Sequence, residues 1–134
     1  MLKRNKRFFL MLLTLSLPFG CVGCVSDGDS ATYEQISGAE AKALMDSESG
    51  YIIIDARTQE EYDEGHIPGA ILIPEYEIAD RAEKELRDKK QLILVYCRSG
   101  RRSEIAAEEL VKLGYTNVKE FGGIIDWEYE IVKN

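Results

Sequence analysis

Short, mostly apolar runs alternate with charged segments from residue 38 to the end of the chain. The apolar runs are three to five residues long, and they predict buried strands at residues 51–54, 71–73, 92–96 and 118–121. Between these runs, apolar residues recur every three or four positions. That spacing predicts helices at residues 38–47, 58–64, 76–89 and 101–113, and a terminal helix after Gly122-Gly123.

Two capping boxes support the first two helix starts. Ser37 is followed three residues later by Glu40, and Thr58 by Glu61, so each pair can satisfy the free amides at a helix N-terminus. Gly114 fits the C-terminal end of the helix that begins near residue 101. The sequence therefore predicts alternating strands and helices, which is typical of the α/β class.

The predicted strands are apolar on both faces, as expected for a mainly parallel sheet covered by helices on both sides. Such three-layer domains collect their functional residues at the carboxyl ends of the strands. Asp55-Ala56-Arg57 follows one strand and Cys97 follows another. We therefore expect these two segments to lie at one edge of the sheet.

Cys97 is the main candidate for chemistry. It begins a short polar loop, Arg98-Ser99-Gly100, that leads directly into a helix. Helix N-terminal amides carry partial positive charge, and Arg98, Arg101 and Arg102 add three cations close to the sulfur. Both effects favour the thiolate, which is the nucleophilic form of cysteine. We interpret Cys97 as a catalytic nucleophile in an anion-binding loop.

Charge and cysteine content exclude several other functions. The 134 residues carry a formal charge of −7, and four of the 17 basic residues lie within the first 24 positions. The remainder has 13 basic and 24 acidic residues, a charge of −11, so nucleic-acid binding is not expected. No cysteine pair has metal-ligand spacing and there is one histidine, so neither a metal nor another cofactor is predicted.

The first 24 residues have the parts of a bacterial export signal. A basic start at residues 3–7 precedes an apolar run at residues 8–19, which is too short for a stable membrane span. We expect a signal peptide at 1–24, a linker at 25–32 and a folded domain at 33–134. If Cys24 is the mature N-terminus, Cys97 is the only unmodified thiol, and no structural disulfide is then available.

Two cysteines resemble the lipidated cysteine of bacterial lipoprotein signals, because each follows a glycine. Cys24, preceded by Val22-Gly23, is favoured over Cys21. Lipidation would make the protein a membrane-anchored lipoprotein on the extracytoplasmic side. The alternative is a secreted or periplasmic protein without lipid.

Four blocks of the domain, taken together and in this order, resemble the rhodanese family. The resemblance covers residues 33–132 and is to the single-domain members. The blocks are Ile54-Asp55-Ala56-Arg57 with Glu61-Tyr62; Gly65-His66-Ile67-Pro68-Gly69-Ala70; Cys97-Arg98-Ser99-Gly100-Arg101-Arg102-Ser103; and Gly122-Gly123 with Trp127.

The resemblance implies a rhodanese-like three-layer fold and sulfurtransferase activity. Cys97 would take sulfane sulfur from a donor such as thiosulfate or polysulfide and pass it, as a persulfide, to a thiophilic acceptor. The substrate cradle would comprise Arg98, Ser99, Gly100, Arg101 and Arg102. We expect a monomer.

The residues outside the loop have mainly structural interpretations. We expect Arg57 to pair with Glu61 at helical spacing and Asp55 to fix its loop by hydrogen bonds; the alternative places both at the rim of the site. His66 is assigned a structural role in a turn. Phe121 and Trp127, like Tyr96, are expected to pack in the core.

Three alternative functions remain at this point. A phosphatase or arsenate reductase of the same superfamily would need arginine at position 103, where this chain has Ser103. A non-catalytic sulfur carrier or sensor would keep Cys97 but give at most one equivalent of sulfur. A pure binding module is not favoured, since such family members commonly lack the cysteine.

Overall fold

All strand pairings in the described part of the chain, residues 32–134, are parallel, and they build one sheet in the order β1-β5-β4-β2-β3. The predicted export signal and nearly all of the predicted linker lie outside the described residues of this computed structural model. The elements are β1 (Glu34–Gln35), α1 (Gly38–Ser47), β2 (Ile52–Asp55), α2 (Gln59–Glu64), β3 (Ile71–Leu72), α3 (Ile78–Glu85), β4 (Ile93–Cys97), α4 (Arg101–Lys112) and β5 (Val118–Gly123), with 3-10 turns η1 (Glu75–Glu77) and η2 (Ile124–Asp126).

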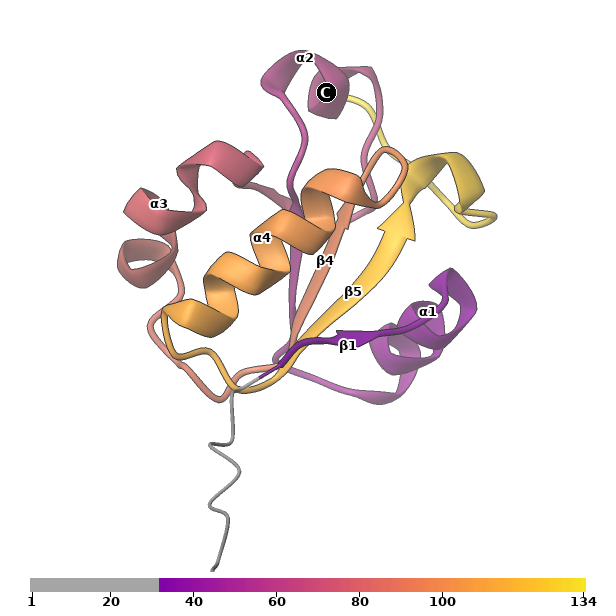
Figure 1. The fold of residues 1–134 in the computed structure, drawn as a ribbon. Helices are drawn as coiled ribbons and strands as arrows, with labels where there is room; N and C mark the ends of the chain where they lie inside the picture. Colours follow the sequence, from indigo (N-terminus) through magenta and orange to yellow (C-terminus); the bar gives the residue numbers. More distant parts are fainter. Residues whose placement is uncertain (1–31) are drawn as a thin grey trace, which may run out of the picture.

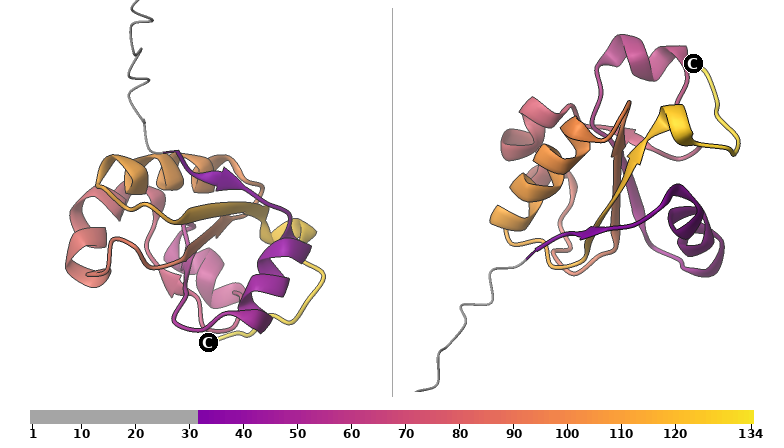
Figure 2. Two further views of the ribbon diagram at one scale, coloured as in Figure 1. Left: turned by 90° about the horizontal axis from the view of Figure 1, so that it is seen from below. Right: turned by 45° about the vertical axis from the view of Figure 1, so that its right-hand side comes forward.

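Helices cover both faces of the sheet, which confirms the predicted three-layer α/β class. Figure 1 shows α3 and α4 on one face, and the view from below in Figure 2 shows α1 on the other. Both capping boxes are present: the side chains of Ser37 and Thr58 accept from backbone amides, and Glu40 and Glu61 reach back. No helix among the described residues is long and apolar enough to span a membrane.

The strand β4 lies at the centre of the sheet and contributes side chains to the core on both faces. Its side chains alternate, so Ile93, Val95 and Cys97 pack with α3 and α4. Leu94 and Tyr96 pack on the opposite face. All five residues of β4 are buried. This alternation fixes the direction of Cys97: its sulfur points toward α4.

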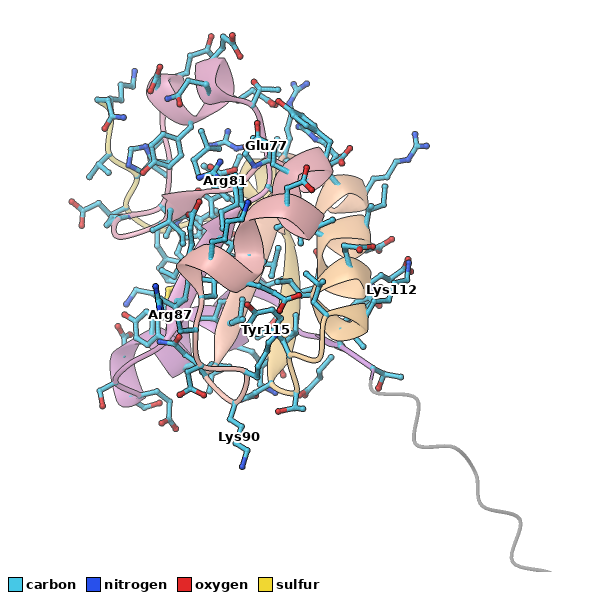
Figure 3. The ribbon with its side chains drawn as sticks, turned by 90° about the vertical axis from the view of Figure 1, so that its left-hand side faces the viewer. Glu77, Arg81, Arg87, Lys90, Lys112 and Tyr115 are labelled. Atoms are coloured by element: carbon cyan, nitrogen blue, oxygen red, sulfur yellow. The ribbon has the colours of Figure 1, made fainter. Side chains whose placement is uncertain are left out.

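The helix predicted at residues 76–89 is shorter than expected. After the turn η1, α3 ends at Glu85, because the Leu86 carbonyl turns away to accept a hydrogen bond of 2.6 Å from the Tyr115 hydroxyl. Figure 3 shows Tyr115 beside the end of α3, with Arg81 and Glu77 paired on its exposed side. A tertiary contact from a distant residue therefore ends this helix.

The prediction of a terminal helix after Gly122-Gly123 is wrong. One 3-10 turn, η2, follows β5, and the remaining chain is non-helical. Its end is held by an isolated antiparallel bridge in which the backbones of Val132 and His66 exchange hydrogen bonds of 2.9 Å. These bonds replace the intrahelical bonds that a terminal helix would make.

Candidate active site

The sulfur of Cys97 lies at the carboxyl end of β4, directly against the N-terminus of α4. Gly100 donates its backbone N–H to Sγ at 3.0 Å, and the Ser103 hydroxyl lies 3.4 Å from Sγ. Gly100 is the N-cap of α4 and offers no side-chain acceptor to the first amides of the helix. The sulfur takes that role, so the helix N-terminus and the thiol satisfy each other.

The pKa of the Cys97 thiol is lowered, although burial acts in the opposite direction. Burial alone raises the pKa, since it disfavours the charged form. Hydrogen bonds from the Ser103 side chain and from the backbone amides of Ser103, Gly100 and Ser99 outweigh that effect. The predicted lowering thus rests mainly on hydrogen bonds at the helix N-terminus.

Two glycines shape the loop around the sulfur. Gly100 has φ of 112°, in the left-handed region that glycine adopts without strain. Gly123, on β5, lies so close to the loop that a Cβ there would meet the Arg98 carbonyl oxygen at 2.0 Å and the Ser99 Cα at 2.6 Å. The Gly122-Gly123 pair therefore gives the loop room to pass over the end of β5.

The five predicted cradle residues fall into two groups. Arg98, Ser99 and Arg101 are exposed, and Gly100 contributes its amide as described. Arg102 is half-buried and holds Glu61 in a bidentate ion pair, with N–O distances of 2.7 and 2.8 Å. Of the five, Gly100 and Ser99 direct backbone amides at the sulfur, whereas the guanidinium of Arg102 is engaged with Glu61 of α2.

The expected pairing of Arg57 with Glu61 is wrong. The Arg57 guanidinium instead binds the buried Asp55 carboxylate, with its Nη2 2.7 Å from Oδ2, and also donates to the Gly65 carbonyl at 2.7 Å. Asp55 accepts a further bond from the Tyr96 hydroxyl at 2.7 Å. Because the Arg57 side chain turns inward to the buried Asp55 carboxylate, Glu61 pairs with Arg102 instead. Asp55 does fix its loop by hydrogen bonds, as predicted.

The aromatic residues of the other blocks, with His66, contribute to packing. His66 stacks on Tyr62 with ring centroids 3.7 Å apart, and its Nδ1 lies 2.9 Å from the Tyr62 carbonyl oxygen. Phe121 is buried, and Trp127 packs against the same cluster on the α1 face of the sheet. Among residues 32–134 none of these side chains makes a hydrogen bond to Cys97, in keeping with the predicted structural roles.

The Glu61–Arg102 ion pair should make the stability of the folded domain depend on pH in the acidic range. The Arg102 guanidinium lowers the pKa of Glu61 from its ordinary 4.5 to about 2. Glu61 therefore stays ionised in the folded chain at pH values where the unfolded chain binds a proton. Its contribution is complete above about pH 4.5 and is lost as pH falls toward 2. In E61Q, the melting temperature should fall less steeply between pH 5 and pH 2.5.

The exposed neighbour Glu60 supplies the matched control for this measurement. Thermal melts of E60Q should keep the wild-type slope over the same pH range, whereas R102A should flatten the slope as E61Q does. Equal slopes in wild type, E61Q and R102A would contradict a stabilising ion pair.

Sequence reasoning assigns no role at the sulfur to two buried polar residues, Ser103 and Glu120. Ser103 enters only as the last residue of the Cys97 block and as the residue at position 103, where a phosphatase would need arginine. Both are almost fully buried, and the Ser103 hydroxyl lies 2.5 Å from Glu120 Oε1. Glu120 directly follows Lys119 in the strand Val118–Gly123, so the sequence alone does not mark it as a buried residue.

Together these features define a class: a parallel α/β domain in which a buried cysteine at the end of the central strand accepts hydrogen bonds from the N-terminus of the following helix. A family model for the rhodanese-like domain matches residues 37–130. The chain therefore belongs to the rhodanese-like domain family.

Characterised relatives support this membership. Thiosulfate sulfurtransferase PspE of Escherichia coli is 42% identical over 73 residues, which is 54% of this chain and 70% of the relative. Thiosulfate sulfurtransferase GlpE of Coxiella burnetii is 35% identical over 97 residues, 72% of this chain and 88% of the relative. The putative sulfur carrier protein YrkF of Bacillus subtilis is 37% identical over 103 residues; that match is 76% of this chain but only 55% of YrkF.

Solved structures show the same fold. An Escherichia coli rhodanese, described with bound anions, superposes with a TM-score of 0.60 at 39% identity, covering 63% of this chain and 99% of the other. A rhodanese-like domain protein from Staphylococcus aureus gives a TM-score of 0.67 at 30% identity, covering 75% and 98%.

Proposed function

We propose that this protein is a sulfurtransferase that moves sulfane sulfur from a small anionic donor to a thiophilic acceptor through a persulfide on Cys97. The observation that carries the proposal is the hydrogen-bonded thiol at the N-terminus of α4, whose pKa is lowered in spite of burial. The names of PspE and GlpE suggest thiosulfate as donor.

The chemistry needs one nucleophile and no separate strong base. The Cys97 thiolate attacks the outer sulfur of thiosulfate, a new S–S bond forms, and sulfite leaves with the electron pair of the bond that breaks. The charge then lies on the outer sulfur of the persulfide. An acceptor thiolate or cyanide attacks that outer sulfur and regenerates the Cys97 thiolate.

The loop suits each anionic species in this cycle. Backbone N–H groups at the start of α4 point toward the sulfur, and Arg98 and Arg101 are exposed residues of the same loop and helix start. Fixed donors of this kind stabilise a charge without reorganising when it develops. We assign the amides to the sulfur and the exposed arginines to the incoming anion.

Intact mass tests the function. The full chain carrying C21S and C24S, in which Cys97 is the only thiol, is measured before thiosulfate, after thiosulfate and again after cyanide. A gain of about 32 Da on Cys97, lost to cyanide with release of thiocyanate, is the result expected for a thiolate nucleophile. If no sulfur is added by either thiosulfate or polysulfide, the proposed reaction is wrong.

R101A is expected to raise the apparent KM for thiosulfate by about three- to tenfold with a smaller change in kcat, because an exposed cation that attracts the donor is lost. Arg87 is a matched control, since it is exposed beyond the end of α3, away from the loop (Figure 3). R87A should leave KM unchanged. An unchanged KM in both R101A and R98A would remove the arginines from the donor site.

A sulfur carrier is the second candidate, favoured by the name of YrkF. A carrier would hold one sulfur on Cys97 for a partner protein and would not cycle with small molecules. Turnover decides between the two: an enzyme forms many equivalents of thiocyanate for each Cys97, whereas a carrier forms at most one.

We also propose that the domain acts outside the cytoplasm, held at the membrane by lipid on Cys24, or on Cys21 as the alternative. The basic and apolar segments of residues 3–19 support this. Labelling cells with an alkynyl fatty acid checks it, because label on wild type should be lost in C24S.

A further inference from the structure

The Ser103 hydroxyl lies within reach of more hydrogen-bond acceptors than it has hydrogens to donate. Its oxygen is 2.5 Å from Glu120 Oε1, 2.8 Å from the Gly100 carbonyl and 3.4 Å from the Cys97 sulfur. A hydroxyl has one hydrogen to donate. The sulfur and the Glu120 carboxylate therefore compete for the same proton.

Glu120 is an unusual neighbour for a thiolate. The residue is 3% exposed, and its Oε1 also accepts the backbone N–H of Gly122 at 2.7 Å. Among the ion pairs of residues 32–134, none involves Glu120. Burying a carboxylate without a cation raises the free energy of the folded state. Only the Ser103 hydroxyl separates Glu120 from the sulfur, so Glu120 can act on the thiol through that hydroxyl.

We propose that Glu120 is a positioning residue that draws the Ser103 proton away from the Cys97 sulfur, and that it thereby favours the sulfur-loaded form of the protein over the free thiolate. The second half of this proposal rests on the function proposed above. The first half concerns only the thiol and holds whether or not sulfur is transferred.

The two states of the sulfur need the Ser103 proton to different degrees. In the free thiolate the full charge lies on Sγ, and every donor lost to Glu120 destabilises it. In the persulfide the charge lies on the outer sulfur, about 2.05 Å farther along the S–S bond. The inner sulfur then needs little from Ser103, whose hydroxyl can turn fully to Glu120.

This difference shifts the transfer equilibrium. Cys97 thiolate and thiosulfate form Cys97 persulfide and sulfite, with one S–S bond made, one broken and the total charge unchanged. Because Glu120 raises the free energy of the thiolate more than that of the persulfide, it increases the share of Cys97 that carries sulfur.

Other charged groups surround Ser103 and Glu120, and one of them, Glu104, supplies a control variant. Arg102 lies near Cys97: the pKa of its guanidinium is raised mainly by the hydrogen bond to Glu61 and also by the charge of Cys97. Tyr33 is near Glu104, Glu108 and Glu120, and burial together with these carboxylates raises its pKa. Glu104 lies on α4 and accepts from Gln35, not from Ser103, so E104Q removes a nearby charge without changing the competition.

Alkylation by iodoacetamide tests the first half. All variants are made in the full chain with C21S and C24S, and the rate at pH 6.5 is divided by the plateau rate at high pH, which removes differences in access. E120Q keeps an acceptor oxygen but no charge, so the normalised rate should rise about three- to tenfold. S103A should lower that rate, since a donor to the thiolate is lost.

The double variant separates the hydroxyl from simple charge effects. In the S103A background, E120Q should accelerate alkylation no more than E104Q does. A slower rate in E120Q would show that Glu120 instead takes up the thiol proton, and an unchanged rate would show no coupling; either result overturns the proposal. If E120Q melts early, E120D, which draws the carboxylate back from Ser103, should accelerate alkylation in the same direction.

Persulfide retention tests the second half. At a fixed ratio of thiosulfate to sulfite, and at a pH where the free thiol is ionised, E120Q should carry about threefold less persulfide per free thiol than wild type or E104Q. Equal or greater loading in E120Q would contradict this half. If wild type forms no persulfide, the proposed function fails, and the alkylation result still decides the competition for the Ser103 proton.

Discussion

Replacing Cys97 with serine is expected to reduce sulfur transfer by more than about a thousandfold, because a neutral hydroxyl is a poor nucleophile and cannot form a persulfide. The side chain is 1% exposed and belongs to the core cluster beneath α4, so a change in stability has to be considered. Serine has a similar shape and can accept the same bond from the Gly100 amide. The free energy of unfolding should change by only about 1 kcal/mol.

Two measurements on C97S check this expectation in the background that lacks Cys21 and Cys24. Thiocyanate formation from thiosulfate and cyanide gives the activity, and urea unfolding gives the stability. Substantial activity in a folded C97S protein would remove Cys97 from the mechanism. A protein that no longer folds would show that the sulfur is needed by the core as well as by the chemistry.

The second large effect is expected far from the cysteine in sequence, at Gly123. A methyl group in G123A would overlap the Arg98 carbonyl oxygen and the Ser99 Cα, and both are backbone atoms that cannot swing aside. The loop must therefore move away from β5. We expect activity to fall by about a hundredfold, since an ångström of displacement misaligns the amide donors, with a stability loss of about 2 kcal/mol.

Gly38 provides the matched control for that substitution. A Cβ at Gly38 would meet the Trp127 ring at 3.5 Å, an ordinary contact distance, and the position lies in the first turn of α1. Steady-state kinetics should show wild-type activity in G38A and a strong loss in G123A. Similar activities in the two variants would mean that the loop tolerates displacement.

Much of the fold follows from local patterns in the chain. The strands β2, β4 and β5 and the helices α1, α2 and α4 begin and end close to their predicted positions, since apolar periodicity and capping boxes act within a few residues. The strand β1 was missed because Glu34–Gln35 is two polar residues long and is defined only by its pairing with β5. Local sequence carries no signal for such a strand.

In the candidate site, too, local features follow from the sequence, whereas contacts between distant elements do not. Cys97 and Gly100 were found from the strand–loop–helix pattern, which is contiguous in sequence. The partner of Arg57, the engagement of Arg102 by Glu61 and the nearness of Glu120 to Ser103 depend on which elements the sheet brings together. Spacing suggested that Arg57 binds Glu61, whereas the buried Asp55 carboxylate, two residues away, binds it more closely in the desolvated interior.

The uniform direction of the strands also gives the domain two distinct ends. The chain enters β1 at the amino end of the sheet, beside the start of β5, while Cys97 and Gly123 pair at the opposite end. The C-terminus lies at the far end as well, near α2 (Figure 1). A surface that holds this domain through its N-terminal side will leave the edge of the sheet that carries the Cys97 loop open to colliding molecules, whereas attachment through residue 134 will crowd the approach to that edge.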